Sequence, residues 1–234
     1  MKILVGDTCL KTASAIISNG KNILSYMQSM GEEPHSVMFP KLVEQVLSTS
    51  RIGFKALDAI ACVYGPGSFT GVRIGLTYLK TIAYTLDLPF YVLNTLDVLA
   101  NMEAGKRHVI SVPLIEARNN EVFTAMYESE KGIYKRITPY TAKHIDKVIE
   151  ETVSICEKDE NALILLSGDA QVKYISRFQD SLPDRILPYS EERDYVDLKR
   201  ACFLISENCR ENPFTAEPFY LRESGAVRMK KQQQ

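Results

Sequence analysis

The sequence predicts an α/β protein made of two similar units, in which mixed sheets are flanked by helices. Two observations support this fold class. The order of strands and helices in the first half recurs in the second half, and each half opens with a strand that ends in an acidic residue at a turn. These turns are Val5-Gly6-Asp7-Thr8 and Leu114-Ile115-Glu116-Ala117. A chain of 234 residues is long enough for two modest lobes. We therefore expect an N-terminal lobe over residues 1–104 and a C-terminal lobe over residues 105–234, with Asp7 and Glu116 near a cleft between them.

The first half is expected to have the order βββαβαβα. Alternating or continuous apolar runs indicate the strands, and apolar residues at helical spacing indicate the helices. Asn19-Gly20 is the favoured type I′ hairpin signal between the second and third strands, and Pro40 predicts that the first regular helix begins near that residue. The predicted strands cover residues 3–6, 13–18, 22–26, 59–64 and 89–93, and the predicted helices cover residues 36–47, 72–86 and 95–104.

The second half is expected to repeat this order as far as its fourth strand. Its predicted strands cover residues 109–117, 122–128, 133–140 and 162–167, with a helix over residues 141–156. A further helix over residues 194–210, an extended segment over residues 218–222 and a frayed polar tail over residues 229–234 end the chain.

Charge and cysteine content exclude several classes of protein. The formal net charge of −1, from 28 basic and 29 acidic side chains, argues against strong unassisted binding to nucleic acid, so any contact with RNA is expected through a partner. The five cysteines form no C-x-x-C pair, and the apolar start of the chain is interrupted at Asp7, too soon for a signal sequence. No apolar run approaches the roughly 20 residues that cross a bilayer. We therefore expect a cytoplasmic protein with reduced thiols and no membrane segment.

The most informative segment is the glycine-rich stretch Tyr64-Gly65-Pro66-Gly67-Ser68-Phe69-Thr70-Gly71-Val72-Arg73-Ile74-Gly75, which joins a strand to a helix. Ser68 or Thr70 can cap that helix, whose free N–H groups and positive dipole end favour an anion. The Walker and dinucleotide motifs both fail, because Val72-Arg73 follows Gly71 and the third glycine comes one residue late. Two interpretations stay open, with the second slightly favoured: a loop that contacts a phosphate or a partner, and a tight turn whose glycines allow close packing. The residues that would contact a phosphate or a partner in the first interpretation are Asp7, Gly65, Gly67, Ser68, Thr70, Gly71 and Arg73.

These features together resemble the TsaB (YeaZ) family, which belongs to the fold group of actin, sugar kinases and the Hsp70 ATPase. Gly6-Asp7-Thr8-Cys9 resembles the family's I-D-T-S opening, Ile115–Phe123 resembles its D-A-R-x-x-E-V-Y, and Pro218–Arg222 resembles its closing P-x-Y-L-R. The resemblance spans nearly the whole chain and implies two tandem ribonuclease H-like lobes. It also implies a subunit of the machinery that makes threonylcarbamoyladenosine beside the anticodon of tRNA, in which the paralogue TsaD is catalytic and the ATPase TsaE docks on the assembled pair.

The resemblance also predicts that this chain carries no metal and no catalytic residue. TsaD has an H-x-x-x-H metal pair on its first helix, and the matching positions here are His35 and Phe39. His108 and His144 have no acid or cysteine at ligand spacing. Asp7 has two interpretations: a hydrogen-bonding turn residue, which we favour, and an acid near a phosphate-bound metal. The chain alone is expected to hold no cofactor, and ATP, ADP or a metal is expected only in the complex, through the partners.

The helix over residues 72–86 carries apolar residues around far more than the roughly 100° stripe of a one-sided helix. We expect one face to lie on the sheet and the other, where Gly75 allows close approach, to contact another helix or another chain. In the resembling family this helix and the first helix pair with the same helices of TsaD, or of a second copy in a homodimer. The predicted subunit interface consists of Met38, Lys41, Leu42, Gln45, Val72, Gly75, Leu76 and Leu79; a helix buried within the chain is the alternative.

Three functions compete at this point. The leading hypothesis is a non-catalytic scaffold that stabilises and activates TsaD. An ATP-binding ATPase or phosphotransferase, using Asp7 and the loop from Gly65 to Gly71, is the alternative from the fold group. A glycoprotease-like peptidase is weaker, because no serine with an ordered histidine and acid can be identified.

Overall fold

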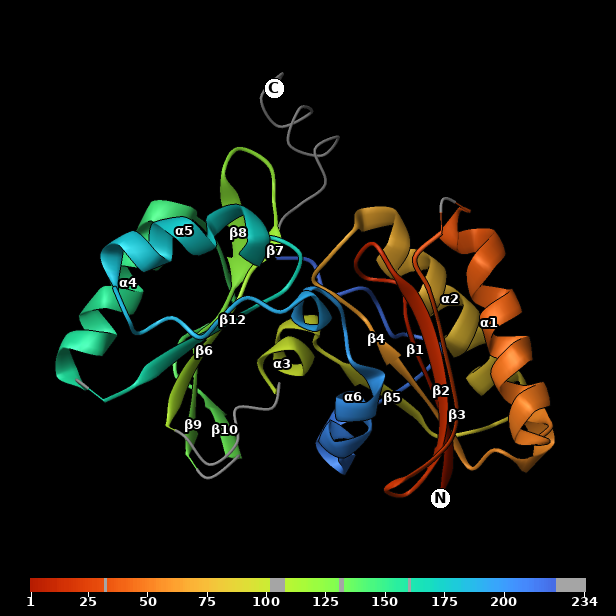
Figure 1. Ribbon diagram of the computed structural model, residues 1–234. Helices are drawn as coiled ribbons and strands as arrows, with labels where there is room; N and C mark the ends of the chain where they lie inside the picture. Colours follow the sequence, from red (N-terminus) through yellow and green to blue (C-terminus); the bar gives the residue numbers. More distant parts are fainter. Residues whose placement is uncertain (32, 102–107, 131–132, 160, 222–234) are drawn as a thin grey trace.

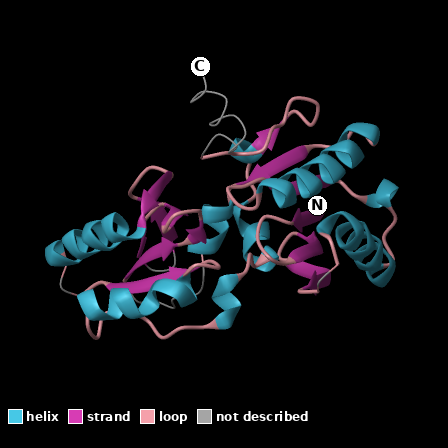
Figure 2. Cartoon of the chain, turned by 90° about the horizontal axis from the view of Figure 1, so that it is seen from above, coloured by secondary structure: helices cyan, strands magenta, loops and turns pink. Residues whose placement is uncertain are grey.

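A computed structural model describes residues 1–31, 33–101, 108–130, 133–159 and 161–221. The strands form two groups that lie side by side, each with helices packed against it (Figure 1). The view from above shows the same two groups apart from one another (Figure 2). The predicted fold class, mixed α/β with helices flanking the sheets, is confirmed.

The first group is a six-stranded sheet in the order β13-β5-β4-β1-β2-β3. The strand β1 pairs antiparallel with β2 and parallel with β4, which in turn pairs parallel with β5. The bounds of the strands are Lys2–Asp7 for β1, Ala13–Asn19 for β2, Asn22–Ser29 for β3, Ala59–Val63 for β4, Phe90–Leu93 for β5 and Arg210–Glu211 for β13. The helices of this half are α1 (His35–Ser50), α2 (Phe69–Thr85) and α3 (Thr95–Ala100), with a 3₁₀ turn over Phe54–Ala56.

Both faces of this sheet are covered because its central strands are apolar on both sides. Ile3 and Val5 of β1 pack into the core that includes α3, whereas Leu4 packs into the core under α1 and α2. This alternation follows from the two-residue repeat of a strand. Parallel strands buried on both faces read as continuous apolar runs, as Ala59–Val63 does.

The second group repeats the order of the first four strands. The four-stranded sheet has the order β10-β9-β6-β12, and its parallel and antiparallel pairs match those of β3-β2-β1-β4. A second, three-stranded sheet has the order β11-β8-β7. The strand bounds are Val109–Pro113 for β6, Ile115–Glu116 for β7, Glu121–Thr124 for β8, Tyr127–Glu130 for β9, Ile133–Arg136 for β10, Thr141–His144 for β11 and Leu163–Ser167 for β12. The helices are α4 (Ile145–Lys158) and α5 (Gln171–Ser181).

Two predicted strands of the second half are each broken in two: residues 109–117 form β6 and β7, and residues 122–128 form parts of β8 and β9. Where β8 ends and β9 begins, the backbone N–H of Met126 donates to Thr138 Oγ1 instead of to a neighbouring strand (2.8 Å), so the two strands join different sheets. The helix predicted over residues 141–156 begins only at Ile145, because residues 141–144 form β11 and pair with β8.

Three predicted local details are also corrected. The register of β2 and β3 places Gly20 and Lys21 at the centre of the turn between these strands. Of the two, only Gly20 has a positive φ (+60°), so the turn is type II′ and not the predicted type I′. The helix α1 begins at His35 and continues through Pro40, which lies inside it. The helix predicted over residues 194–210 is a 3₁₀ turn (Glu191–Asp194), then α6 (Leu198–Leu204), then a 3₁₀ turn (Glu207–Cys209), because Asp197 caps α6 by accepting the Lys199 N–H.

The end of the described chain returns to the first sheet. The helix α6 packs against β1 and β2, β13 pairs with β5, and the N–H of Phe219 donates to the carbonyl of Tyr64 (2.8 Å). Part of the stretch assigned to the C-terminal lobe therefore packs with the N-terminal strands. The predicted boundary between residues 104 and 105 lies outside the described residues, as do Arg222 and the predicted tail over residues 229–234, so the two lobes stay a prediction. No helix in the described ranges is long and apolar enough to cross a membrane.

Candidate functional site: the glycine-rich loop and the α1–α2 face

The glycines of the loop make room for two other segments of the same chain. Gly65 has a φ of +112°, and a Cβ on it would lie 2.6 Å from the carbonyl oxygen of Phe219. A Cβ on Gly67 would lie 2.2 Å from the carbonyl oxygen of Cys9, and one on Gly71 would lie 2.1 Å from that of Thr8. Since real Cβ contacts are never this short, only glycine fits these three positions.

Hydrogen bonds fix the loop to the turn that follows β1. The N–H of Ser68 donates to the Cys9 carbonyl (2.7 Å), and the Thr8 hydroxyl donates to the Gly71 carbonyl (2.6 Å). The same hydroxyl accepts from the N–H of Gly75 (3.0 Å). The first bond occupies a loop N–H that an anion would need, and all three hold the loop against its own chain, which supports the tight-turn interpretation over the phosphate interpretation.

Ser68 is the N-cap of α2, as predicted. Its Oγ accepts from the N–H of Gly71 (3.2 Å), which satisfies one of the free donors at the helix start. Thr70 and Arg73 lie within the first two turns of α2 and are exposed.

Asp7 is fully buried below this loop. Its Oδ1 accepts from the N–H of Cys9 (2.9 Å), whereas Oδ2 has no partner among the described residues. Burial raises the pKa of Asp7 from 3.8 to about 7, and hydrogen bonds from Cys9 and Thr8 oppose part of that rise. These contacts are those of a hydrogen-bonding turn residue, the interpretation that the sequence favours.

Glu116 does not join Asp7 at a shared site. Its carboxylate is exposed and pairs with Lys173 (2.5 Å), while its backbone N–H donates to Asp169 Oδ1 (2.9 Å). Burial raises the pKa of Asp169, and the hydrogen bond from the Glu116 N–H and then the Lys11 charge oppose part of the rise.

The two positions of the expected histidine pair have different environments. Phe39 is buried in the core, where its ring fills the space beside Gly6 and meets Tyr78 edge to face, with ring centroids 5.6 Å apart. His35 Nε2 lies 3.3 Å from the carbonyl oxygen of Lys11. Phenylalanine at this position therefore contributes packing where a metal ligand would contribute coordination.

His108 has acidic neighbours that its sequence spacing does not predict. Its Nε2 lies 3.0 Å from Glu128 and its Nδ1 lies 2.8 Å from Asp159. Because the two carboxylates contact different ring nitrogens, they do not converge on one ion. Over the described ranges of the chain, no group of three His, Cys, Asp or Glu side chains could hold a metal ion.

Five of the eight predicted interface residues are buried within the chain and do not form an exposed contact surface. The side chains of Leu42, Leu76 and Leu79 are at most 4% exposed because they pack into the core between the sheet, α1 and α2. Val72 is 1% exposed and packs into the core on the other face of the sheet. A Cβ on Gly75 would lie 2.4 Å from the Thr8 hydroxyl, so this glycine accommodates Thr8 and not a partner helix.

The exposed face of α1 and α2 is formed by other positions. Of the predicted residues, Lys41 and Gln45 are exposed and Met38 is half-buried. Val37 on α1 is 46% exposed. On α2 the outward stripe, at helical spacing, consists of Thr70, Arg73, Thr77, Thr81 and Tyr84, with Ile74, Tyr78 and Ile82 half-buried beside it.

An extended segment over residues 214–220 lies along α2. The sequence patterns do not predict this contact. Arg73 Nε donates to the Tyr220 hydroxyl (2.7 Å), and its guanidinium lies 3.8 Å from the ring centroid of Phe69. Lys80 Nζ donates to the Ala216 carbonyl (2.8 Å), one of the contacts that hold this segment antiparallel to the helix. At the end of α2 the rings of Tyr84 and Phe214 are in contact, with centroids 6.0 Å apart. The cluster of aromatic residues near the chain end is the signal that could have predicted this contact.

The fold and this site define a class of protein: an α/β chain whose two halves have the same strand order, with an acid-bearing turn packed under a glycine-rich strand-to-helix loop. A family model described as "TsaD: tRNA N6-adenosine threonylcarbamoyltransferase" matches residues 29–174, more than half of the chain. The chain belongs to this family.

The relatives support this assignment. The chain is 31% identical over 141 residues to the tRNA threonylcarbamoyladenosine biosynthesis protein TsaB of Bacillus subtilis (strain 168), covering 59% of this chain and 60% of the relative. It is 32% identical over 138 residues to TsaB of Escherichia coli (strain K12), covering 57% and 58%. The chain thus matches less than two thirds of the length of these relatives. It shares its fold with YeaZ from Pseudomonas aeruginosa, with a TM-score of 0.72 and 22% identity over 94% of this chain and 99% of that one.

Proposed function

We propose that this chain is a non-catalytic subunit of the complex that transfers a threonylcarbamoyl group to the tRNA adenosine beside the anticodon. It acts in the cytoplasm by dimerising with the catalytic paralogue TsaD and recruiting TsaE, and it meets tRNA only indirectly. The similarity to relatives named as TsaB biosynthesis proteins carries this proposal. Phe39, buried at the second position of the expected metal pair, supports a role without catalysis.

The outward face of α1 and α2 is the surface that we assign to TsaD, or to a second copy of this chain. From Ile74 to Tyr84 the exposed or half-buried residues of α2 include only one charged side chain, Lys80, whose Nζ is already bonded to Ala216. Small threonine side chains at helical spacing let another helix come close without desolvating a charge. This stripe replaces the buried leucines as the predicted contact surface.

The ATPase alternative depends on the loop from Gly65 to Gly71 and on Asp7. The Ser68 N–H of this loop donates to the Cys9 carbonyl, and other segments of the same chain fill the space beside the loop glycines. Asp7 is buried. These contacts favour the scaffold. Calorimetry of the isolated chain with ATP and magnesium separates the two functions, because the ATPase alternative requires binding that is lost in Asp7→Ala. A peptidase would cleave glycoprotein substrates and lose that activity in His35→Ala.

Reconstitution tests the scaffold proposal directly. Purified TsaD, given threonylcarbamoyl-adenylate and tRNA, should form modified tRNA only when this chain is added. Modification at the full rate without the chain would end the proposal.

A matched set of variants tests the surface. Thr77→Glu places an unpaired charge on the exposed stripe of α2, and we expect a folded chain that no longer co-elutes with TsaD. Ser154→Glu, exposed on α4, is the control and should co-elute normally. Leu79→Glu buries a charge in the core and should unfold the chain, as measured by circular dichroism. Normal co-elution of a folded Thr77→Glu variant would move the contact surface elsewhere.

A further inference from the structure

A cavity of about 370 Å³ lies at the junction of the two strand groups, away from the α1–α2 face. Its walls come from the first half (Asn94, Asp97), from the second half (Tyr127, Arg136, Tyr140) and from the returning segment near Glu211. Junctions between halves of a protein, with aromatic walls and a few convergent polar groups, are common ligand sites, and this volume is at the small end of their range.

The cavity has an acidic pole that is held in place. Asp97, in the first turn of α3, accepts from the Tyr127 hydroxyl at Oδ1 (2.7 Å). The Tyr140 hydroxyl approaches both of its oxygens (2.9 and 2.7 Å). Burial, and then the Asp97 charge, raise the pKa of both tyrosines, so they stay protonated as donors. A carboxylate has about four acceptor positions, which leaves capacity for a further donor.

The opposite pole is basic and lies across the same tyrosine. The Arg136 guanidinium lies 3.7 Å from the ring centroid of Tyr140, whose hydroxyl contacts Asp97. The two charges therefore sit at the face and at the hydroxyl of one phenol ring. A ligand in contact with both needs a cationic and an anionic group close together.

Asn94 adds a donor without an acceptor. Its side chain is the N-cap of α3, where Oδ1 accepts from the N–H of Leu96 (2.9 Å). The residue is 6% exposed and lines the cavity, and its Nδ2 has no partner among the described residues. A buried donor left unpaired is costly, and an acceptor from a ligand would remove that cost.

We infer that this cavity binds a small zwitterion of the α-amino-acid class. The ammonium group contacts Asp97 and the face of a tyrosine, and the carboxylate contacts Arg136 and Asn94 Nδ2. Phosphorylated ligands are disfavoured, because the cavity offers one guanidinium against the carboxylates of Asp97 and Glu211. This inference does not depend on the proposed role with TsaD.

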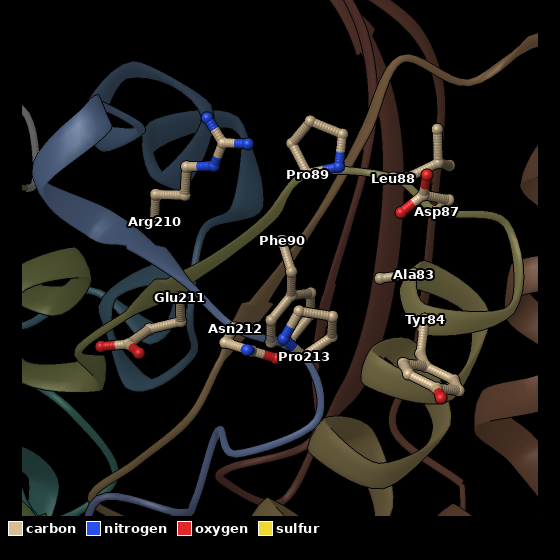
Figure 3. A pocket seen from close by; sticks show the side chains of 10 residues that line it. All are labelled: Ala83, Tyr84, Asp87, Leu88, Pro89, Phe90, Arg210, Glu211, Asn212 and Pro213. Carbon is tan, nitrogen blue, oxygen red and sulfur yellow. The ribbon is translucent and has the colours of Figure 1, made fainter.

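A second, larger groove provides the controls. It lies between the end of α2 and β13, and its lining residues come from the end of α2, the loop that leads into β5, the start of β5 and residues 210–213. Figure 3 shows Asp87 and Arg210 on opposite sides of this groove, with Pro89 between them. These two residues have the same side-chain types as Asp97 and Arg136 but do not line the cavity with Tyr140, so they serve as matched controls.

Calorimetric titration of the full chain tests the inference, with the twenty protein amino acids as separate probes. At least one should bind, and its decarboxylated amine and its deaminated acid should each bind at least about tenfold more weakly, since each loses a charged contact. Failure of all twenty to bind, or equal binding of the amine or of the acid, would overturn the inference.

Variants locate the site. Asp97→Asn and Arg136→Gln should each lower the affinity about tenfold or more, whereas Asp87→Asn and Arg210→Gln should leave it unchanged. Arg136 is exposed on β10, so its variant keeps the test decisive if Asp97→Asn loses stability. Wild-type affinity in Arg136→Gln would refute the assignment, and co-elution of that variant with TsaD would show that the proposed complex is a separate property.

Discussion

Asp7 should make the stability of the folded chain depend on pH in an unusual direction. Most paired carboxylates stabilise a protein as the pH rises, because their pKa falls on folding. Asp7 behaves in the opposite way, since burial raises its pKa from 3.8 to about 7. Between these values the folded chain holds a proton that the unfolded chain has released.

The size of the effect follows from this difference in pKa. The contribution of Asp7 is fully present below its unfolded pKa of 3.8 and is lost as the pH rises through about 7. One pKa unit corresponds to about 1.4 kcal/mol, so the loss is about 4 kcal/mol, a large part of the stability of a typical domain.

Urea denaturation of the wild type and of Asp7→Asn measures this loss. Asparagine is neutral at every pH and keeps the oxygen that accepts from the Cys9 N–H, so it should remove the dependence that Asp7 causes. We expect the free energy of unfolding of the wild type, relative to Asp7→Asn, to fall by a few kcal/mol from about pH 4 to about pH 8. Asp180→Asn, exposed on α5, should follow the wild type. Parallel curves for the wild type and Asp7→Asn over this range would refute the reasoning.

Two further substitutions test the loop and its helix. Gly71→Ala should lower the free energy of unfolding by about 1–3 kcal/mol, because the new Cβ would meet the carbonyl oxygen of Thr8 at 2.1 Å. Gly53→Ala is the control and should lower the free energy of unfolding far less, because its Cβ would have no atom within 4 Å. Equal midpoints of the two variants in urea would contradict this account. Ser68→Ala should lower it by about 1 kcal/mol through loss of the α2 N-cap, and Ser154→Ala on the exposed side of α4 should not; an unchanged midpoint for Ser68→Ala would show that water replaces the cap.

Local sequence patterns predicted the first half well. The apolar run of β4 and the cap at Ser68 each depend on residues close together in the chain. The tight-turn interpretation of the loop was also within reach, because glycine and proline restrict the backbone locally. The repeated strand order could be read from these elements in sequence.

Contacts between distant residues were beyond those patterns. The broad apolar surface of α2 predicts that two faces are covered, but Leu76 and Leu79 pack within the chain, and periodicity does not tell a core from a partner. His108 meets Glu128 and Asp159 only through the fold. The strand breaks near Met126 depend on which sheet each strand joins, and the burial of Asp7 depends on the loop above it.

The pairing of β13 with β5 has a consequence for how the protein is made. A ribosome releases the N-terminal strands long before residues 210–211, so the outer edge of β5 stays without its neighbour until residues 210–211 have been synthesised. Contacts between such distant positions slow folding, and an open strand edge is prone to pair with other chains. The nascent first half is thus the stage at which this protein is most exposed to aggregation, and the pairing of residues 210–211 with β5 ends that period.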